Sequence, residues 1–177
     1  MTARESVASV DASWLRMDEP GNLMVVNGVM MLDRPLPFDR FREIIASRLV
    51  AAVPRMRQRI VQSAFPLITP HWEVDPHFDL HYHVRPARLE RADQASLQAL
   101  VGRLMSERFD PERPPWTYHF VPDYEGGCAT IARFHHCLGD GLALLHLFLK
   151  MTDEAPPEPP EDTARADGQR SMSEIIS

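Results

Sequence analysis

Two adjacent histidines, His135 and His136, separate a short apolar run from a longer one, and this arrangement constrains the fold more than any other part of the chain. The run before them, residues 128–134, has the length and the apolar character of a buried strand. The run after them, residues 142–149, consists of strong helix formers and is apolar on nearly every face. The sequence therefore predicts a tight strand-to-helix connection inside the core that holds the histidines beside a cleft.

The residue types of this connection indicate acid–base chemistry. A histidine has an ordinary pKa near neutrality, so it can take a proton from a hydroxyl or a thiol and return it. Asp140 is placed to cap the following helix, or alternatively to turn inward and fix the loop through an arginine. Gly141 has no side chain, which lets a backbone or a ligand approach closely. The sequence has no Gly-x-Ser-x-Gly elbow, so we expect a base that acts directly on an acceptor.

Three segments carry a resemblance to a known family. His-His-x-x-x-Asp-Gly at residues 135–141 resembles the motif of the coenzyme A-dependent acyltransferase superfamily, which includes the condensation domains of peptide synthetases. Residues 13–24, SWLRMDEPGNLM, resemble the opening of bacterial wax ester synthase/diacylglycerol acyltransferases. Residues 109–116, FDPERPPW, resemble that family's Pro-Leu-Trp segment, with Pro115 in place of the usual leucine. The resemblance covers about residues 9–152.

The resemblance implies a fold and a domain organisation. The expected fold is α/β, an α+β two-layer sandwich with a mixed sheet and flanking helices, as in the N-terminal half of a chloramphenicol acetyltransferase-like two-domain acyltransferase. Residues 1–153 would form this half-domain, and residues 154–177, rich in proline and acidic residues, a linker to a C-terminal half that this sequence lacks. The family's cleft lies between two such halves, so we expect residues 1–177 alone to be weakly active or inactive.

The resemblance also implies roles for individual residues. His136 would be the general base, which takes the proton of a diacylglycerol or long-chain alcohol hydroxyl as that oxygen attacks acyl-CoA. His135 would support the loop, and Asp140 would brace it. Gly141 and Trp116 would contact substrate, although the residue type alone makes Trp116 a core anchor. No cofactor is expected, because acyl-CoA is a co-substrate, and no metal.

Composition limits the partners. The net charge is −6, and no basic stripe indicates nucleic acid. The longest apolar run, residues 142–149, is far shorter than a bilayer-spanning segment, so we expect a cytoplasmic protein with at most peripheral contact to the inner membrane face or a lipid droplet. The expected partners are acyl-CoA, diacylglycerol or a fatty alcohol, and a C-terminal half on another chain. The alternatives are a condensation-type fragment that uses carrier-bound acyl groups and a non-catalytic acyl-binding or heterodimerisation module.

The remaining elements follow from apolar periodicity. Helices are expected over residues 10–17, 38–53 and 93–109, and strands over residues 23–32, 56–61, 71–74, 77–84 and 116–121. The strand at 23–32 is almost continuously apolar, so both of its faces should be covered, and Gly28 should mark a bulge or a close backbone approach. His81 and His83 would share one face of their strand, a weak metal signal without further ligands. Cys128 and Cys137 are expected to be buried and unbridged.

Overall fold

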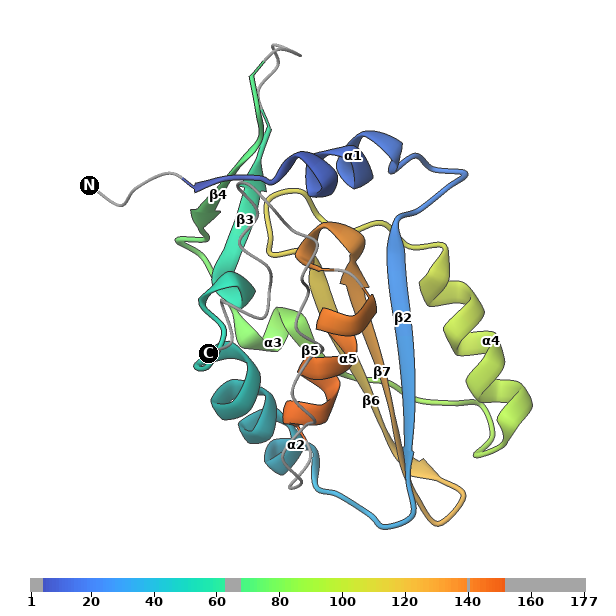
Figure 1. The fold of residues 1–177 in the computed structure, drawn as a ribbon. Helices are drawn as coiled ribbons and strands as arrows, with labels where there is room; N and C mark the ends of the chain where they lie inside the picture. The colour runs from blue at the N-terminus through green and yellow to red at the C-terminus, as the bar shows by residue number, and fades with distance from the viewer. Residues whose placement is uncertain (1–4, 63–67, 140, 152–177) are drawn as a thin grey trace.

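The computed structural model describes residues 5–62, 68–139 and 141–151, and its central element is a mixed four-stranded sheet (Figure 1). The strands of this sheet run in the order β2 (Val25–Leu32), β7 (Gly127–His135), β6 (Trp116–Tyr124) and β5 (Val84–Pro86). Strand β5 is parallel to β6, and the other neighbours are antiparallel. A smaller antiparallel sheet contains β1 (Glu5–Ser6), β4 (His71–Val74) and β3 (Gln58–Val61) in that order.

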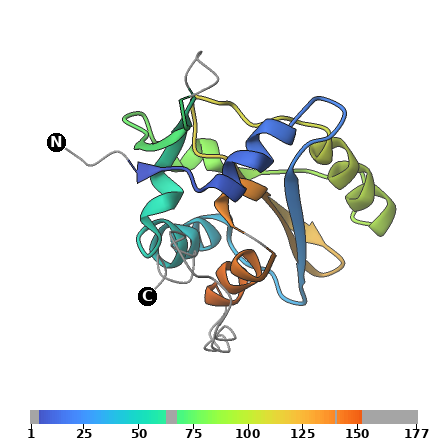
Figure 2. The same cartoon turned by 45° about the horizontal axis from the view of Figure 1, so that its top comes forward.

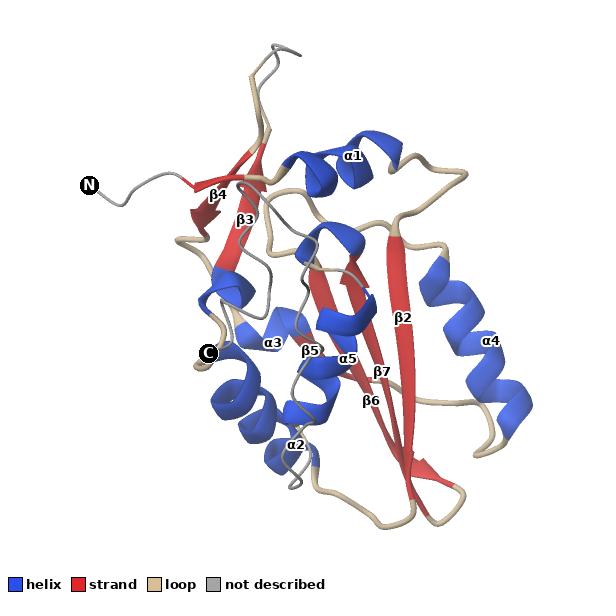
Figure 3. Cartoon of the chain, viewed as in Figure 1, coloured by secondary structure: helices blue, strands red, loops and turns tan. Residues whose placement is uncertain are grey.

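Helices cover both faces of the larger sheet, which confirms the expected mixed α/β fold with flanking helices (Figure 3). Apolar residues of α2, its π-helical continuation η1 and α5 pack on one face, and α4 packs on the other. The helical segments are α1 (Ser9–Met17), α2 (Phe38–Ile44), η1 (Ile45–Val50), η2 (Pro54–Arg57), α3 (Leu80–His83), α4 (Gln94–Met105), η3 (His136–Leu138) and α5 (Gly141–Lys150).

Strand β7 is the most enclosed element of the fold. All nine of its residues are buried, because it pairs with β2 on one edge and with β6 on the other. The hairpin between β6 and β7 turns through Glu125 and Gly126, whose φ angles of 48° and 85° lie in the left-handed region. The expected buried strand and the helix that follows the histidines are confirmed.

The other predicted helices are present with somewhat different bounds or with a change of helix type. The helix expected over residues 38–53 begins as α2 and continues as the π-helix η1, and its buried face consists of Phe41, Ile45 and Leu49. At the start of α4 the Asp93 carboxylate accepts a hydrogen bond of 2.8 Å from the backbone N–H of Ser96. This hydrogen bond, together with hydrogen bonds from the side chains of Ser96 and Arg91, lowers the pKa of Asp93 to about 2.

The prediction of a strand over residues 77–84 is wrong. The Asp79 carboxylate accepts a hydrogen bond of 2.9 Å from the backbone N–H of His81, and this local cap starts the helical turn α3 instead. His81 is therefore exposed while His83 is buried, so the two rings do not share a strand face. Within the described residues, no group of three or more histidine, cysteine or acidic side chains could hold a metal ion.

The expectation that both faces of β2 are covered is also wrong. Strand β2 lies at the end of the sheet, and Val29 and Met31 are 42% and 65% exposed. The register with β7 is continuous, so Gly28 marks no bulge. The close approach at Gly28 comes from a side chain rather than a backbone, since a Cβ atom there would lie 2.5 Å from Cζ of Phe148 on α5.

We expect Gly28→Ala to lower the free energy of unfolding by about 1–3 kcal/mol, because overpacking forces the Phe148 ring or α5 to move. Urea denaturation followed by circular dichroism measures the change. Adding Phe148→Leu should recover most of the loss, and Gly21→Ala is the matched control, because a Cβ atom at Gly21 meets nothing within 4 Å. A stability of Gly28→Ala equal to that of the control would contradict this packing.

The two cysteines are free and buried, as expected. Burial raises the pKa of the Cys128 thiol and raises that of Cys137 well above its ordinary value, so neither favours the thiolate. The expected linker over residues 154–177 lies outside the described residues.

Candidate active site

The histidine turn connects the end of β7 to α5 through the short 3-10 segment η3. His135 is the last residue of β7, and its backbone N–H donates a hydrogen bond of 3.0 Å to the carbonyl of Pro115. The backbone N–H of His136 donates a hydrogen bond of 2.8 Å to the carbonyl of Met24. Since these bonds come from two different segments, the backbone of both histidines is fixed by tertiary contacts.

The imidazole of His136 lies against α1, which crosses the end of the larger sheet (Figure 2). Its ring stacks on the indole of Trp14 with 4.3 Å between the ring centroids and 21° between the planes. The residue is half-buried, and within the described part of the chain neither ring nitrogen has a hydrogen-bond partner. The ring is thus held in position by stacking, while its nitrogens are not engaged by the described residues.

The imidazole of His135 is held more tightly. Its side chain is 5% exposed, and Nδ1 accepts a hydrogen bond of 3.1 Å from the backbone N–H of Cys137. Nε2 lies 3.8 Å from Oδ1 of Asp18. Burial lowers the pKa of His135, and the nearby Asp18 carboxylate opposes this effect. His135 is therefore a neutral ring whose acceptor nitrogen is already occupied, which makes it a poor base.

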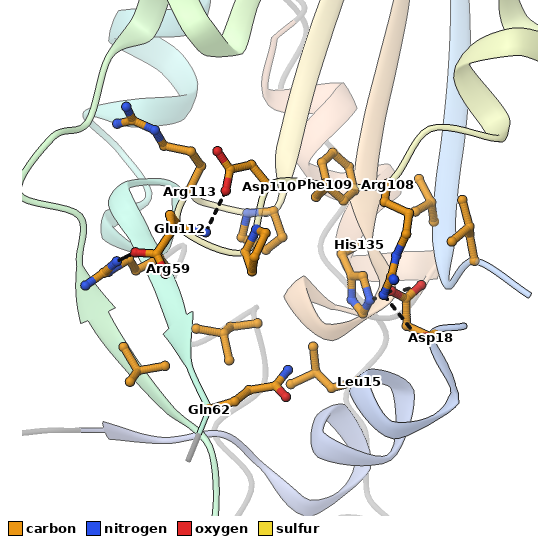
Figure 4. A pocket seen from close by; sticks show the side chains of 16 residues that line it. Leu15, Asp18, Arg59, Gln62, Arg108, Phe109, Asp110, Glu112, Arg113 and His135 are labelled. Atoms are coloured by element: carbon orange, nitrogen blue, oxygen red, sulfur yellow. Dashed lines mark hydrogen bonds and ion pairs between the residues drawn. The ribbon is translucent and has the colours of Figure 1, made fainter. Parts of the chain in front are cut away.

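A cleft of about 680 Å³ opens beside the histidine turn (Figure 4). His135 is on its wall, whereas His136 is not among the residues that line it. The lining residues come from the α1–β2 segment, β3 and the loop before β6, and they are Leu15, Asp18, Leu23, Val25, Arg59, Ile60, Val61, Gln62, Arg108, Phe109, Asp110, Pro111, Glu112, Arg113, Pro115 and His135.

The charged groups of the cleft are paired along its walls. Arg59 contacts Glu112, Nη2 of Arg108 lies 3.3 Å from Oδ2 of Asp18, and Nη1 of Arg113 lies 3.3 Å from Oδ2 of Asp75. The sequence analysis named none of these side chains as a site residue. Three of them, Asp18, Glu112 and Arg113, belong to the two upstream segments at residues 13–24 and 109–116, which meet here.

Trp116, another predicted site residue, is not among the residues that line this cleft. Trp116 is fully buried, its Nε1–H donates a hydrogen bond of 2.8 Å to the carbonyl of Met56, and its ring stacks on His83 at 4.4 Å. These contacts make it a core residue, and its contact with substrate stays a prediction. Gly141 begins α5, and Asp140 lies outside the described residues.

The sequence and the architecture match known proteins. The sequence profile of the wax ester synthase/diacylglycerol acyltransferase catalytic domain matches residues 7–175. The chain belongs to this family. The wax ester synthase/diacylglycerol acyltransferase of Marinobacter aquaeolei VT8 has a similar structure, with a TM-score of 0.63 and 26% identity over 80% of this chain and 36% of that one.

Several curated relatives of this chain come from mycobacteria. A probable diacylglycerol O-acyltransferase of Mycobacterium tuberculosis is 29% identical over 154 residues, which are 84% of this chain and 33% of that protein. Another from the same species is 31% identical over 85% of this chain and 31% of its own length. The chain thus spans about a third of the length of these relatives.

Condensation domains share the fold of this family member. The first condensation domain of the calcium-dependent antibiotic synthetase has a TM-score of 0.69, with 15% identity over 85% of this chain and 36% of that one. At this identity the likeness concerns the fold alone.

Among the described helices, none has the length and apolar character to cross a membrane.

Proposed function

We propose that this chain carries the general base of an O-acyltransferase that moves a fatty acyl group from acyl-CoA to the hydroxyl of a diacylglycerol or a long-chain alcohol. The observation that carries the proposal is the half-buried ring of His136, held by Trp14 on a rigid turn and without a partner on either nitrogen among the described residues. Membership of the family and the acyltransferase names of its relatives support this assignment.

The proposed reaction is a direct transfer. His136 takes the proton of the acceptor hydroxyl, and the oxygen attacks the thioester carbonyl to form a tetrahedral oxyanion. The C–S bond then breaks, the acyl group stays on the acceptor as an ester, and coenzyme A leaves as a thiolate that takes the proton back from His136. One ester and one free thiol form for each thioester, so no covalent acyl-enzyme and no cofactor are needed.

The neighbours of His136 have supporting roles in this proposal. His135 holds the turn, because its Nδ1 is already bonded to the Cys137 amide. We keep Asp140 as the residue that braces the loop, and Gly141 as the point where substrate approaches the start of α5. The acceptor and the product are lipids, so we place the reaction at a lipid surface, the inner membrane face or a lipid droplet, which the protein contacts peripherally from the cytoplasm.

A second half of the catalytic unit is part of the proposal, since the chain spans about a third of the two mycobacterial relatives and of the solved structure named above. We expect residues 1–177 alone to form little or no ester. A C-terminal half from the family, added as a separate chain, should raise the rate until the two chains are saturated. A rate for residues 1–177 alone that equals the saturated rate would contradict the need for a second half.

The experiment that tests the proposed function compares acyl donors. The assembled halves receive palmitoyl-CoA or palmitoyl-acyl carrier protein, together with diacylglycerol or hexadecanol, and thin-layer chromatography measures the ester. We expect triacylglycerol or wax ester from palmitoyl-CoA and much less from the carrier protein. Product from the carrier protein alone would favour a condensation-type fragment, and binding of palmitoyl-CoA without ester would favour a non-catalytic module.

A further inference from the structure

The carboxylate of Asp18, just after the end of α1, has three contacts, and Figure 4 shows the two with Arg108 and His135. Its side chain is 16% exposed. Oδ1 accepts a hydrogen bond of 2.8 Å from the backbone N–H of Met24, and Oδ2 lies 3.3 Å from Nη2 of Arg108. The third contact is the approach of His135 Nε2 to Oδ1 at 3.8 Å. With two donors fixing its oxygens, the carboxylate has little freedom to turn away from His135.

The contacts of the two ring nitrogens determine which of them carries the proton in neutral His135. Because the Cys137 N–H donates to Nδ1, the proton of the neutral ring is on Nε2, the nitrogen that faces Asp18. Nε2 is buried and has no hydrogen-bond partner among the described residues. At 3.8 Å the attraction between this N–H and the carboxylate is electrostatic, and such attractions are stronger in a buried site than in water.

The same segment also reaches His136. Met24 donates its N–H to Asp18 and accepts the backbone N–H of His136 through its carbonyl, at 2.8 Å in both cases. Trp14, one helical turn before Asp18, stacks on the His136 ring. Residues 14–24 thus contact both histidines, through a carboxylate, a backbone carbonyl and an aromatic ring, and Asp18 is the residue that joins these contacts.

We infer that Asp18 is a positioning residue for acyl transfer: its carboxylate fixes the His135 ring and the Met24 amide, and through them the turn that presents His136. The inference rests on the proposed function of His136 and adds a residue that acts through the histidines rather than on the substrate. Arg108 completes the arrangement by holding the second carboxylate oxygen at the edge of the cleft.

The first test of Asp18 uses residues 1–177 alone and needs no catalysis. The chain has three tryptophans, so labelling with 5-fluorotryptophan gives three fluorine resonances, and Trp14→Phe identifies one of them. In Asp18→Asn, which has nearly the same shape, we expect the Trp14 resonance to shift or broaden while the resonances of Trp72 and Trp116 stay in place. Glu19→Gln, the adjacent exposed acid, is the matched control and should move none. A Trp14 resonance that Asp18→Asn leaves unchanged would overturn the inference.

The second test measures kinetics in the assembled halves. We expect Asp18→Asn to lower kcat about 10-fold while KM changes less than about 2-fold, because a displaced turn misplaces the base without removing substrate contacts. Asp18→Glu, which keeps the charge, should recover part of kcat. A kcat of Asp18→Asn equal to wild type in an active assembly would overturn the inference. If the wild type forms no ester, the proposed function fails, while the fluorine spectra still decide whether Asp18 holds the segment that stacks on His136.

Discussion

Replacing His136 by alanine is expected to lower the rate of ester formation by about 10³-fold, the middle of the range for loss of a general base. Without the imidazole, the acceptor hydroxyl has no group to take its proton as it attacks the thioester. The ring is half-buried and stacks on Trp14, and the backbone hydrogen bonds of residue 136 do not depend on it, so we expect the fold to tolerate its loss. Steady-state ester formation by the assembled halves measures the effect.

The control for His136→Ala is His77→Ala, because His77 is exposed and lies outside the cleft lining. We expect the control to retain the wild-type rate, and both variants to keep the wild-type circular dichroism spectrum. An ester-forming rate of His136→Ala within a few-fold of the control would remove His136 from the proposed mechanism. If His136→Ala lost activity because it unfolds, its circular dichroism spectrum would differ from that of the wild type.

Replacing Trp116 by alanine is expected to lower the free energy of unfolding by about 3–5 kcal/mol, a large part of the stability of a domain of this size. The side chain is fully buried, stacks on His83 and donates its N–H to the carbonyl of Met56, so truncation leaves a cavity and a buried acceptor without its partner. Urea denaturation of residues 1–177 followed by circular dichroism measures the loss.

Two further variants separate the contributions at Trp116. Trp116→Phe keeps much of the apolar volume and should cost less than the alanine variant. Trp14→Ala is the matched control, because Trp14 is only half-buried and should also cost less. If Trp116→Ala were as stable as Trp14→Ala, Trp116 would not be the core residue that its burial and its contacts with His83 and Met56 indicate.

The parts of the fold that depend on local sequence were predictable. The buried β7, the histidine turn and α5 follow from an apolar run, a turn and a second apolar run in direct succession. The amphipathic helices follow in the same way from the spacing of their apolar residues. The segment at 77–84 was missed because its alternation resembles a strand, whereas a single Asp79 carboxylate bonds the His81 N–H and starts a helical turn.

The parts that depend on tertiary placement were not predictable. The apolar composition of β2 does not reveal that it lies at the end of the sheet, where Met31 is 65% exposed. The contact between Asp18 and His135 joins residues more than a hundred positions apart, and only the packing of α1 against the turn brings them together. The family resemblance named both upstream segments, but it did not indicate which of their side chains face the cleft.

The most direct test of the proposed transfer is to measure both products, the ester and the free thiol, in one reaction. The assembled halves receive labelled palmitoyl-CoA with diacylglycerol or hexadecanol, and the ester and the free thiol of coenzyme A are measured together over time. Direct transfer assisted by His136 predicts one ester for each thiol, and neither product when the acceptor is omitted. Thiol release without ester, or a burst of thiol before any acceptor is added, would contradict it.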